Sequence, residues 1–306
     1  MPSSEFSLIA RYFSSLGSGS AVNLGVGDDC AILDIPAGRR LATSVDTLVS
    51  TVHFPEDAFP EDIGYRAVAV AASDLAAMGA SPLAMTLALT LPEADDFWLH
   101  SFSQGLGAAV NEYALPLVGG DTTKGPLTIT VQVFGCLPQG QALLRSGARP
   151  GDLVCVTGTL GDAAGGLAIV QDRWSTSPEH AEFVIDRYYR PTARLALGQQ
   201  LLGLATSAID ISDGLLADAG HIAAASGVAI HLEPALLPLS PALQSHSDGA
   251  QSLAWAVGGG DDYELCFTLP AQLSIPDGCT CVGEVKVGSG VQCDFDVDIT
   301  AGYRHF

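Results

Sequence analysis

Segments with a helical pattern and segments with a strand pattern alternate along the whole chain, and this alternation restricts the fold more than any other feature. Helices are predicted at Glu5–Phe13, Glu61–Met78, Asp96–Ala114, Asp162–Asp172, Thr192–Leu202 and Leu215–Ser226. Strands are predicted at Cys30–Ile35, Leu41–Leu48, Leu83–Leu91, Leu127–Leu137, Leu153–Thr157, Ala208–Ile211 and Glu264–Leu269. Such mixing predicts an α/β or α+β protein.

The region between Pro138 and Gly151 is rich in Gly, Pro and Arg, and a strand pattern restarts at Asp152. A chain of 306 residues can form one large domain or two medium ones, each with a buried core. We therefore predict two domains, residues 1–138 and residues 150–306.

The charge balance excludes several classes of protein. The chain has 34 acidic and 13 basic residues, a net charge of -21, and only two lysines, so a broad basic face for nucleic acid is not expected. Charged residues make up only 15% of the chain and the mean hydropathy is +0.31, which excludes disorder. A negative surface also repels phosphates, so a bound nucleotide would need bridging cations.

Three features predict a cytoplasmic protein. Residues Met1–Glu5 show no basic segment followed by an apolar one, so no signal peptide is expected. The seven cysteines lack the spacing of a disulfide framework, which favours a reducing compartment. The apolar stretch from Leu75 to Pro92 is interrupted by Gly79 and Pro82, so we predict a helix end, a turn and a buried strand there, and no membrane span.

Many of the 24 aspartates stand beside glycines or at the ends of predicted elements. These are Asp28, Asp29, Asp46, Asp121, Asp210, Asp213, Asp261 and Asp262. Glycines allow tight turns, and several carboxylates brought together in this way form a site for a hard cation, with Mg²⁺ the best match. The alternative is that aspartate is simply favoured in turns and helix caps.

Asp74 differs from the other aspartates because it lies within a helical run of Ala, Val and Leu. A carboxylate on such an apolar helix needs a partner or a metal ion. Asp74 is therefore the strongest single indication of a functional site.

Several common motifs are absent from the sequence. The patterns GxxxxGK[ST], HExxH and GxSxG do not occur, and Gly25-Val-Gly-Asp-Asp-Cys lacks the third glycine of a dinucleotide-binding loop. His53 follows Asp46 closely and is either a structural residue or part of a site. Arg145 is one of few cations and could be an anion clamp or a surface salt-bridge partner.

A set of motifs, in their order and spacing, resembles the thiamine-monophosphate kinase family, within the superfamily of aminoimidazole ribonucleotide synthetase and selenophosphate synthetase. The motifs are Glu5-Phe-Ser-Leu-Ile-Ala-Arg-Tyr-Phe, Gly27-Asp-Asp-Cys-Ala, Ser73-Asp-Leu-Ala-Ala-Met-Gly-Ala, Gly119-Gly-Asp-Thr-Thr, Arg145-Ser-Gly-Ala, Asp210-Ile-Ser-Asp-Gly-Leu, Asp261-Asp-Tyr-Glu-Leu and Gly302-Tyr-Arg-His-Phe. The resemblance implies a two-domain α/β fold in which the N-terminal domain binds ATP and Mg²⁺ and its sheet pairs with a second copy. It also implies ATP-dependent phosphorylation of thiamine monophosphate to thiamine diphosphate.

The resemblance further implies roles for individual residues. Several Mg²⁺ ions would be held by Asp29, Asp46, Asp74, Asp121, Asp210 and Asp213, with Ser44 and Val45 in the same metal-binding turn as Asp46. ATP would contact Gly120, Asp121, Arg145 and Ser212, and thiamine monophosphate would contact His53, Asp261 and Tyr303. Two positions depart from the family: Asp261 stands where Glu is usual, and Val45 where Thr is common.

The implied reaction fits the residues. A phosphate monoester has a second pKa of about 6, so the acceptor is already ionised at neutral pH and no general base is expected. Bringing two anionic groups together is the main obstacle, and carboxylate-held Mg²⁺ would reduce it. Two alternatives remain: another ATP-dependent enzyme of the superfamily acting on a carbonyl or selenide, and a nucleotide-binding regulatory protein without turnover.

Overall fold

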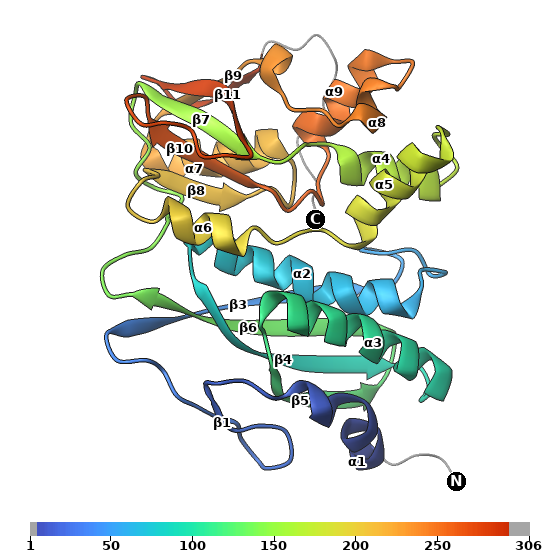
Figure 1. Cartoon of the computed structure of the whole chain (residues 1–306). Coiled ribbons are helices and arrows are strands. Elements are labelled where there is room, and N and C mark those ends of the chain that lie inside the picture. The colour runs from blue at the N-terminus through green and yellow to red at the C-terminus, as the bar shows by residue number, and fades with distance from the viewer. Residues whose placement is uncertain (1–4, 294–306) are drawn as a thin grey trace. The chain divides into compact units, whose positions relative to one another are not determined.

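The computed structural model describes residues 5–293 and forms two compact units (Figure 1). Unit 1 consists of the described part of Met1–Leu75 together with Ala80–Gly140, and unit 2 of Ala76–Gly79 together with the described part of Gln141–Phe306. Both units combine helices with a sheet, so the predicted mixture of helices and strands is confirmed. The predicted domains, residues 1–138 and 150–306, and their roles stay predictions.

The sheet of unit 1 has four strands in the order β3-β6-β4-β5. Their bounds are Arg39–Val49 for β3, Ser81–Leu91 for β4, Leu117–Lys124 for β5 and Thr128–Pro138 for β6. Strand β6 is antiparallel to both β3 and β4, whereas β4 and β5 are parallel. The parallel pair is joined by helix α3 (Asp96–Tyr113), which the Asp95 side chain caps by accepting the Trp98 amide at 2.6 Å.

Helices α2 (Pro60–Met78) and α3 contribute to the buried core of unit 1 and approach each other closely. A Cβ atom built on Gly105 of α3 would lie 1.8 Å from the carbonyl oxygen of Glu61 on α2. Only glycine allows this backbone contact. Strands β4 and β6 bury alternate residues such as Leu89 and Val131, as expected for a sheet with one covered face.

The first residues of unit 1 differ in detail from the prediction. The helix predicted at Glu5–Phe13 is α-helical only in α1 (Glu5–Leu8) and continues as a π-helix over Ile9–Phe13. The predicted strand Cys30–Ile35 is reduced to the two residues of β2 (Ile32–Leu33), which pairs with β1 (Val22–Leu24). The pairing is irregular, and a two-stranded ribbon of this length has few hydrogen bonds.

The sheet of unit 2 has six strands in the order β12-β9-β11-β7-β10-β8, antiparallel except for the pair β9–β12. The strands are β7 (Asp152–Thr157), β8 (Ser207–Asp210), β9 (Ala229–Leu232), β10 (Leu265–Pro270), β11 (Cys279–Lys286) and β12 (Gly290–Cys293). The helices are α4 (Asp162–Val170), α5 (Pro178–Tyr189), α6 (Leu195–Leu201), α7 (Leu215–Ser226), α8 (Pro241–Gln244) and α9 (Gly249–Gly258). Leu215, Ala219 and Ile222 form one apolar face of α7 and join the core under the sheet.

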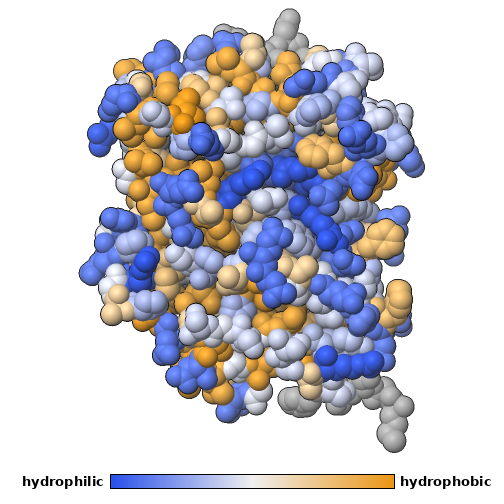
Figure 2. Space-filling model, viewed as in Figure 1, coloured by the Kyte–Doolittle hydropathy of each residue, from blue (hydrophilic) through white to orange (hydrophobic). Residues whose placement is uncertain are grey.

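The apolar stretch from Leu75 to Pro92 has the predicted form. Helix α2 ends at Met78, Gly79 turns with φ 71°, and β4 follows as a largely buried strand. No helix among residues 5–293 is long and apolar enough to cross a membrane. On the face shown in Figure 2, hydrophilic and hydrophobic residues are interspersed. The charged side chains that are exposed on this face stay hydrated.

Candidate active site

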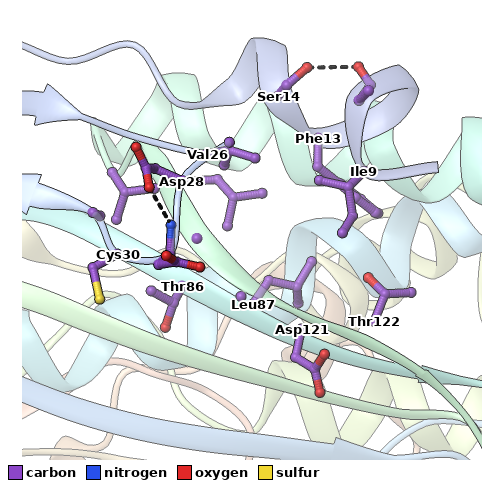
Figure 3. A pocket seen from close by; sticks show the side chains of 18 residues that line it. Ile9, Phe13, Ser14, Val26, Asp28, Cys30, Thr86, Leu87, Asp121 and Thr122 are labelled. Carbon is purple, nitrogen blue, oxygen red and sulfur yellow. Dashed lines mark hydrogen bonds between the residues drawn. The ribbon is translucent and has the colours of Figure 1, made fainter. Parts of the chain in front are cut away.

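A pocket of about 730 Å³ in unit 1 brings together three of the predicted site residues (Figure 3). Asp29 comes from the loop before β2, and Gly120 and Asp121 come from β5. Figure 3 shows Ile9 and Phe13 reaching into the same region from the N-terminal helical segment. The pocket therefore has carboxylates on one part of its wall and apolar side chains on another.

The loop that carries Asp29 is shaped by its neighbour. The carboxylate Oδ1 of Asp28 accepts the backbone amide of Asp29 at 2.8 Å, an interaction drawn in Figure 3. Asp28 thus serves as a turn residue, as the alternative interpretation of the aspartates predicts. Asp28 and Asp29 are both exposed, so the Asp29 carboxylate is accessible to a ligand in the pocket.

Gly120 has a steric role at the pocket wall. A Cβ atom at this position would lie 1.8 Å from the carbonyl oxygen of Leu87 on β4. The close approach keeps β5 against β4 next to Asp121, which pairs with Ala88. In the Gly119-Gly120-Asp121 motif, Gly120 is therefore required by the packing of β5 against β4, and Asp121 places a carboxylate at the pocket.

Ser44 and Asp74 form a second group of predicted residues within unit 1. The Ser44 hydroxyl on β3 donates a hydrogen bond to Oδ2 of Asp74 on α2. Asp46 lies two residues along β3 and so shares the face of Ser44, while the Val45 side chain points to the other face and is 59% exposed. Val45 could contribute only its backbone oxygen to this group. The predicted need of Asp74 for a partner is met at least by Ser44.

His53 follows the end of β3 and folds back on it. Its Nδ1 accepts the backbone amide of Val49 at 2.9 Å, and its own amide donates to the Val49 carbonyl at 3.0 Å. Nδ1 is therefore the unprotonated nitrogen and the ring proton is on Nε2. The half-buried ring has a structural role, and its predicted contact with substrate stays a prediction.

In unit 2 the predicted residues Asp210, Ser212 and Asp213 lie at the end of β8 and in the turn before α7. The backbone amides of Ser212, Asp213 and Gly214 all donate to one oxygen, Oδ2 of Asp218, each at 3.1 Å. Asp218 is 2% exposed and stands in the first turn of α7, where the helix dipole favours a negative charge. Asp218 therefore fixes the shape of the turn that presents Ser212 and Asp213.

Three backbone hydrogen bonds join this turn to the segment that contains Asp261. The Asp261 amide donates to the Ser212 carbonyl and the Tyr263 amide to the Ile211 carbonyl, each at 2.9 Å. The Ile211 amide donates to the backbone carbonyl of Glu264 at 2.7 Å. A residue predicted to bind substrate, Asp261, thus lies directly beside a residue predicted to bind ATP, Ser212. We call these three bonds the ladder between the two loops, which are the loop after β8 and the loop before β10.

Two buried carboxylates anchor the Asp261 segment. Both oxygens of Asp262 are used, because they accept the amides of Gly161 at 2.7 Å and Ala163 at 3.2 Å at the start of α4. Glu264 is fully buried and binds Arg194 through two bonds, at 2.5 and 2.7 Å, and Arg187 at 2.8 Å. Removing one partner of such a buried ion pair usually costs about 3–5 kcal/mol.

Burial raises the pKa of Asp262 from 3.8 to about 8. The folded protein then binds this proton more tightly than the unfolded chain, so stability should fall as the pH rises from about 4 to about 8. Asp262→Asn, which cannot ionise, should show a shallower fall. Thermal unfolding of both proteins at several pH values measures this, and parallel profiles would contradict it. Burial also raises the pKa of Asp218, to about 7, so some slope should remain in the variant.

The remaining predicted residues are less informative. Arg145 is exposed in the loop before β7, where its carbonyl accepts the Ser226 hydroxyl at 3.2 Å. Tyr303 lies outside the described residues. Within residues 5–293, no group of three or more Asp, Glu, His or Cys side chains is close enough to hold a metal ion. The structure thus brings together Asp29 with Asp121, Ser44 with Asp74, and Ser212 with Asp261.

Sequence reasoning missed three residues that shape these loops: Asp218, Asp262 in its anchoring role, and Glu264. A signal existed for two of them. Asp218 follows the Ser212-Asp-Gly turn at a spacing that suits the first turn of the next helix, and Glu264 begins an apolar strand in which a charge requires a partner.

Residues 27–137 match the family described as AIR synthase related protein, N-terminal domain, which places this part of the chain in that class. Thiamine-monophosphate kinase of Salmonella typhimurium is 48% identical over 100% of this chain and 99% of that protein. The chain therefore belongs to the thiamine-monophosphate kinase family.

Solved structures agree with this assignment. The crystal structure of thiamine-monophosphate kinase from Stenotrophomonas maltophilia has a TM-score of 0.84 and 43% identity, covering 90% of this chain and 92% of that one. AaThiL, solved as a complex with AMPPCP and TMP, has a TM-score of 0.82 and 34% identity, covering 99% and 97%. The predicted family is therefore confirmed.

Proposed function

We propose that this chain transfers the γ-phosphoryl group of ATP to thiamine monophosphate and forms thiamine diphosphate and ADP, the last step in making thiamine diphosphate. The observation that carries the proposal is the unit 1 pocket, where Asp29, Gly120 and Asp121 surround one cavity. The similarity of the whole chain to AaThiL, which was solved with AMPPCP and TMP, supports the same substrates for this chain. The transfer is direct and in line, from one phosphate oxygen to another.

The pocket suits a nucleotide. Ile9, Phe13 and Val26 give an apolar surface for a base, while Asp29 and Asp121 give carboxylates near the phosphates. These carboxylates repel a bare triphosphate, so cations must lie between them. The net charge of -21 makes this requirement stronger.

Mg²⁺ fits the donors that the chain offers. The predicted ligands are carboxylate and hydroxyl oxygens, which Mg²⁺ prefers: Asp29, Ser44, Asp46, Asp74, Asp121, Asp210 and Asp213, with the backbone oxygen of Val45. When bound, Mg²⁺ would neutralise charge that develops on the phosphoryl oxygens. Ser44 orients the Asp74 carboxylate, and Asp218 orients the turn that carries Asp213.

The protein's own residues are proposed to bind and orient the two substrates without removing a proton from the acceptor. The acceptor phosphate has a second pKa of about 6 and is mostly dianionic at neutral pH. His53 uses its unprotonated nitrogen for the Val49 amide, which agrees with a role in binding. Arg145 and Ser212 contact ATP in this proposal, and Asp261 contacts thiamine monophosphate together with His53 and Tyr303.

The function is tested by incubating the protein with ATP and Mg²⁺ and with thiamine monophosphate or thiamine as acceptor. ADP release is measured and the product is identified by chromatography. Thiamine diphosphate formed only from the monophosphate is the expected result. Binding of ATP without phosphorylation of either acceptor would overturn the substrate assignment, and the other ATP-dependent reactions of the superfamily would be tested next.

We also propose that the chain forms a homodimer through the face of its unit 1 sheet that points away from α2. Leu41 and Val45 on β3 are 47% and 59% exposed on this face, and Thr43 and Thr47 lie between and beside them. Apolar side chains in a row on a sheet face favour coverage by another surface. A second copy with the same face would bury them.

Leu41→Glu should weaken this dimer about 100-fold or more, because an unpaired carboxylate buried in an interface costs at least about 3 kcal/mol. Light scattering coupled to size-exclusion chromatography should show a dimer for the wild type and a monomer for the variant at micromolar concentration. Leu273→Glu is the control, since Leu273 is an exposed leucine of unit 2. A wild-type monomer, or an unchanged dimer of the variant, would contradict the proposed interface.

The proposed location is the cytoplasm. Cys30, Cys136, Cys155, Cys266, Cys279 and Cys281 carry free thiols. Free thiols persist in reducing compartments, which supports this location.

A further inference from the structure

The segment Asp261–Tyr263 has a backbone that its residue types rarely adopt. Asp261 has φ 69° and Tyr263 has φ 51°, both in the left-handed region. For a bulky aromatic residue such as Tyr263 this conformation is a marked exception. Strained conformations of this kind persist only where the surrounding structure holds them, and they are concentrated at ligand-binding sites.

The surrounding structure holds this segment from two sides. Asp262, between the two strained residues, is fully buried and accepts the Gly161 and Ala163 amides. The amides of Asp261 and Tyr263 donate to the neighbouring loop through the ladder. With the middle side chain directed into the interior, the two outer side chains remain half-buried.

The two outer side chains contact each other. The hydroxyl of Tyr263 donates a hydrogen bond to Oδ1 of Asp261 at 3.3 Å. We infer that Tyr263 is a positioning residue whose hydroxyl holds the Asp261 carboxylate in the orientation that binds thiamine monophosphate. This inference rests on the proposed function, because it assigns Asp261 to the substrate site.

The chemistry of the substrate indicates which of its parts Asp261 would meet. A carboxylate repels the phosphate of thiamine monophosphate, whereas the thiazolium ring is a cation and the aminopyrimidine ring carries an N–H donor. A carboxylate directed at either group must be oriented, because hydrogen bonds weaken steeply with angle.

Tyr263→Phe removes only the hydroxyl and keeps the ring, so the backbone and the packing should be retained. We expect KM for thiamine monophosphate to rise about tenfold, the lower end of the effect of losing a hydrogen bond to a charged group, because this bond is long at 3.3 Å. kcat, KM for ATP and the melting temperature should stay near the wild-type values, since the binding of the acceptor alone is affected. Tyr12→Phe is the matched control, because the Tyr12 hydroxyl donates to the Asp96 carboxylate at 3.0 Å in unit 1.

A double-mutant cycle with Asp261→Ala shows whether Tyr263 acts through Asp261. If it does, adding Tyr263→Phe to Asp261→Ala should change KM no further. Independent, additive effects would mean that Tyr263 contacts substrate itself, and would overturn the positioning role. An unchanged KM in Tyr263→Phe, with an active wild type, would also overturn it while leaving the proposed function intact. A wild type that does not phosphorylate thiamine monophosphate would overturn the proposed function and this inference together.

Discussion

Asp74→Asn should lower kcat at least about 100-fold while the protein keeps its folded stability. The asparagine side chain has the same size and its carbonyl oxygen can still accept the Ser44 hydroxyl. It carries no negative charge, however, and Mg²⁺ prefers carboxylate oxygens. Replacing residues that only support metal ligands already costs about 10- to 100-fold in metal affinity or activity, so loss of a ligand itself should cost no less.

The measurement is turnover of thiamine monophosphate at saturating ATP over a range of Mg²⁺ concentrations, with the melting temperature recorded in parallel. Asp57→Asn is the control, because Asp57 is an exposed aspartate in the loop before α2. Activity of Asp74→Asn close to that of the wild type would exclude Asp74 from the site. A large fall in melting temperature would indicate that its bond with Ser44 is structural.

Gly120→Ala should both destabilise unit 1 and weaken ATP binding at least tenfold. The new methyl carbon would start 1.8 Å from the Leu87 carbonyl oxygen and 3.0 Å from the Leu87 amide, so β5 must move away from β4. Overpacking of this kind costs about 1–3 kcal/mol, and backbone atoms on both sides place this case at the upper end. Because Asp121 follows directly on β5, its carboxylate would move with the strand.

Gly119→Ala gives the matched control for stability. A Cβ atom at Gly119 has the Thr86 methyl carbon at 3.9 Å as its nearest neighbour, so the substitution should leave the melting temperature nearly unchanged. Isothermal titration with a non-hydrolysable ATP analogue and thermal unfolding test both variants. Equal melting temperatures for the two alanine variants would show that the β4–β5 contact is more adaptable than the backbone geometry indicates.

The long elements of the fold could be predicted from the sequence because their apolar pattern is strong. Helix α7 has the predicted bounds Leu215–Ser226, and β4 and β6 differ from prediction by one or two residues at their ends. Strand β11 was missed because its pattern is interrupted, with an irregular register between Cys281 and Gly283. Helix α5 was missed although Ser177 and Pro178 form a common helix start, with the Ser177 hydroxyl accepting the His180 amide.

The site was predictable to the extent that its residues stand beside glycines: Asp29 follows Gly27-Asp28, Asp121 follows Gly119-Gly120, and Asp213 precedes Gly214. The hydrogen-bonding partners of other residues in and around the site were not predictable, because they lie in distant parts of the chain. The bond between Ser44 and Asp74 spans 30 positions, and the bond between Gly161 and Asp262 spans 101. No local pattern encodes such a pairing: the sequence indicates that Asp74 needs a partner, but not that Ser44 is that partner.

The ladder between Ile211–Ser212 and Asp261–Glu264 also bears on how this family can be redesigned. Each loop uses the backbone of the other as a hydrogen-bonding partner in addition to its own anchor, Asp218 or Asp262, so the shape of each depends on the other. To change the phosphoryl acceptor by introducing loop sequences from a related enzyme, both loops must therefore be exchanged together, along with their anchors Asp218 and Asp262. The same hydrogen bonds restrict which substitutions can accumulate in these loops during evolution. A substitution that changes the backbone of one loop is tolerated only when the other loop changes to match it.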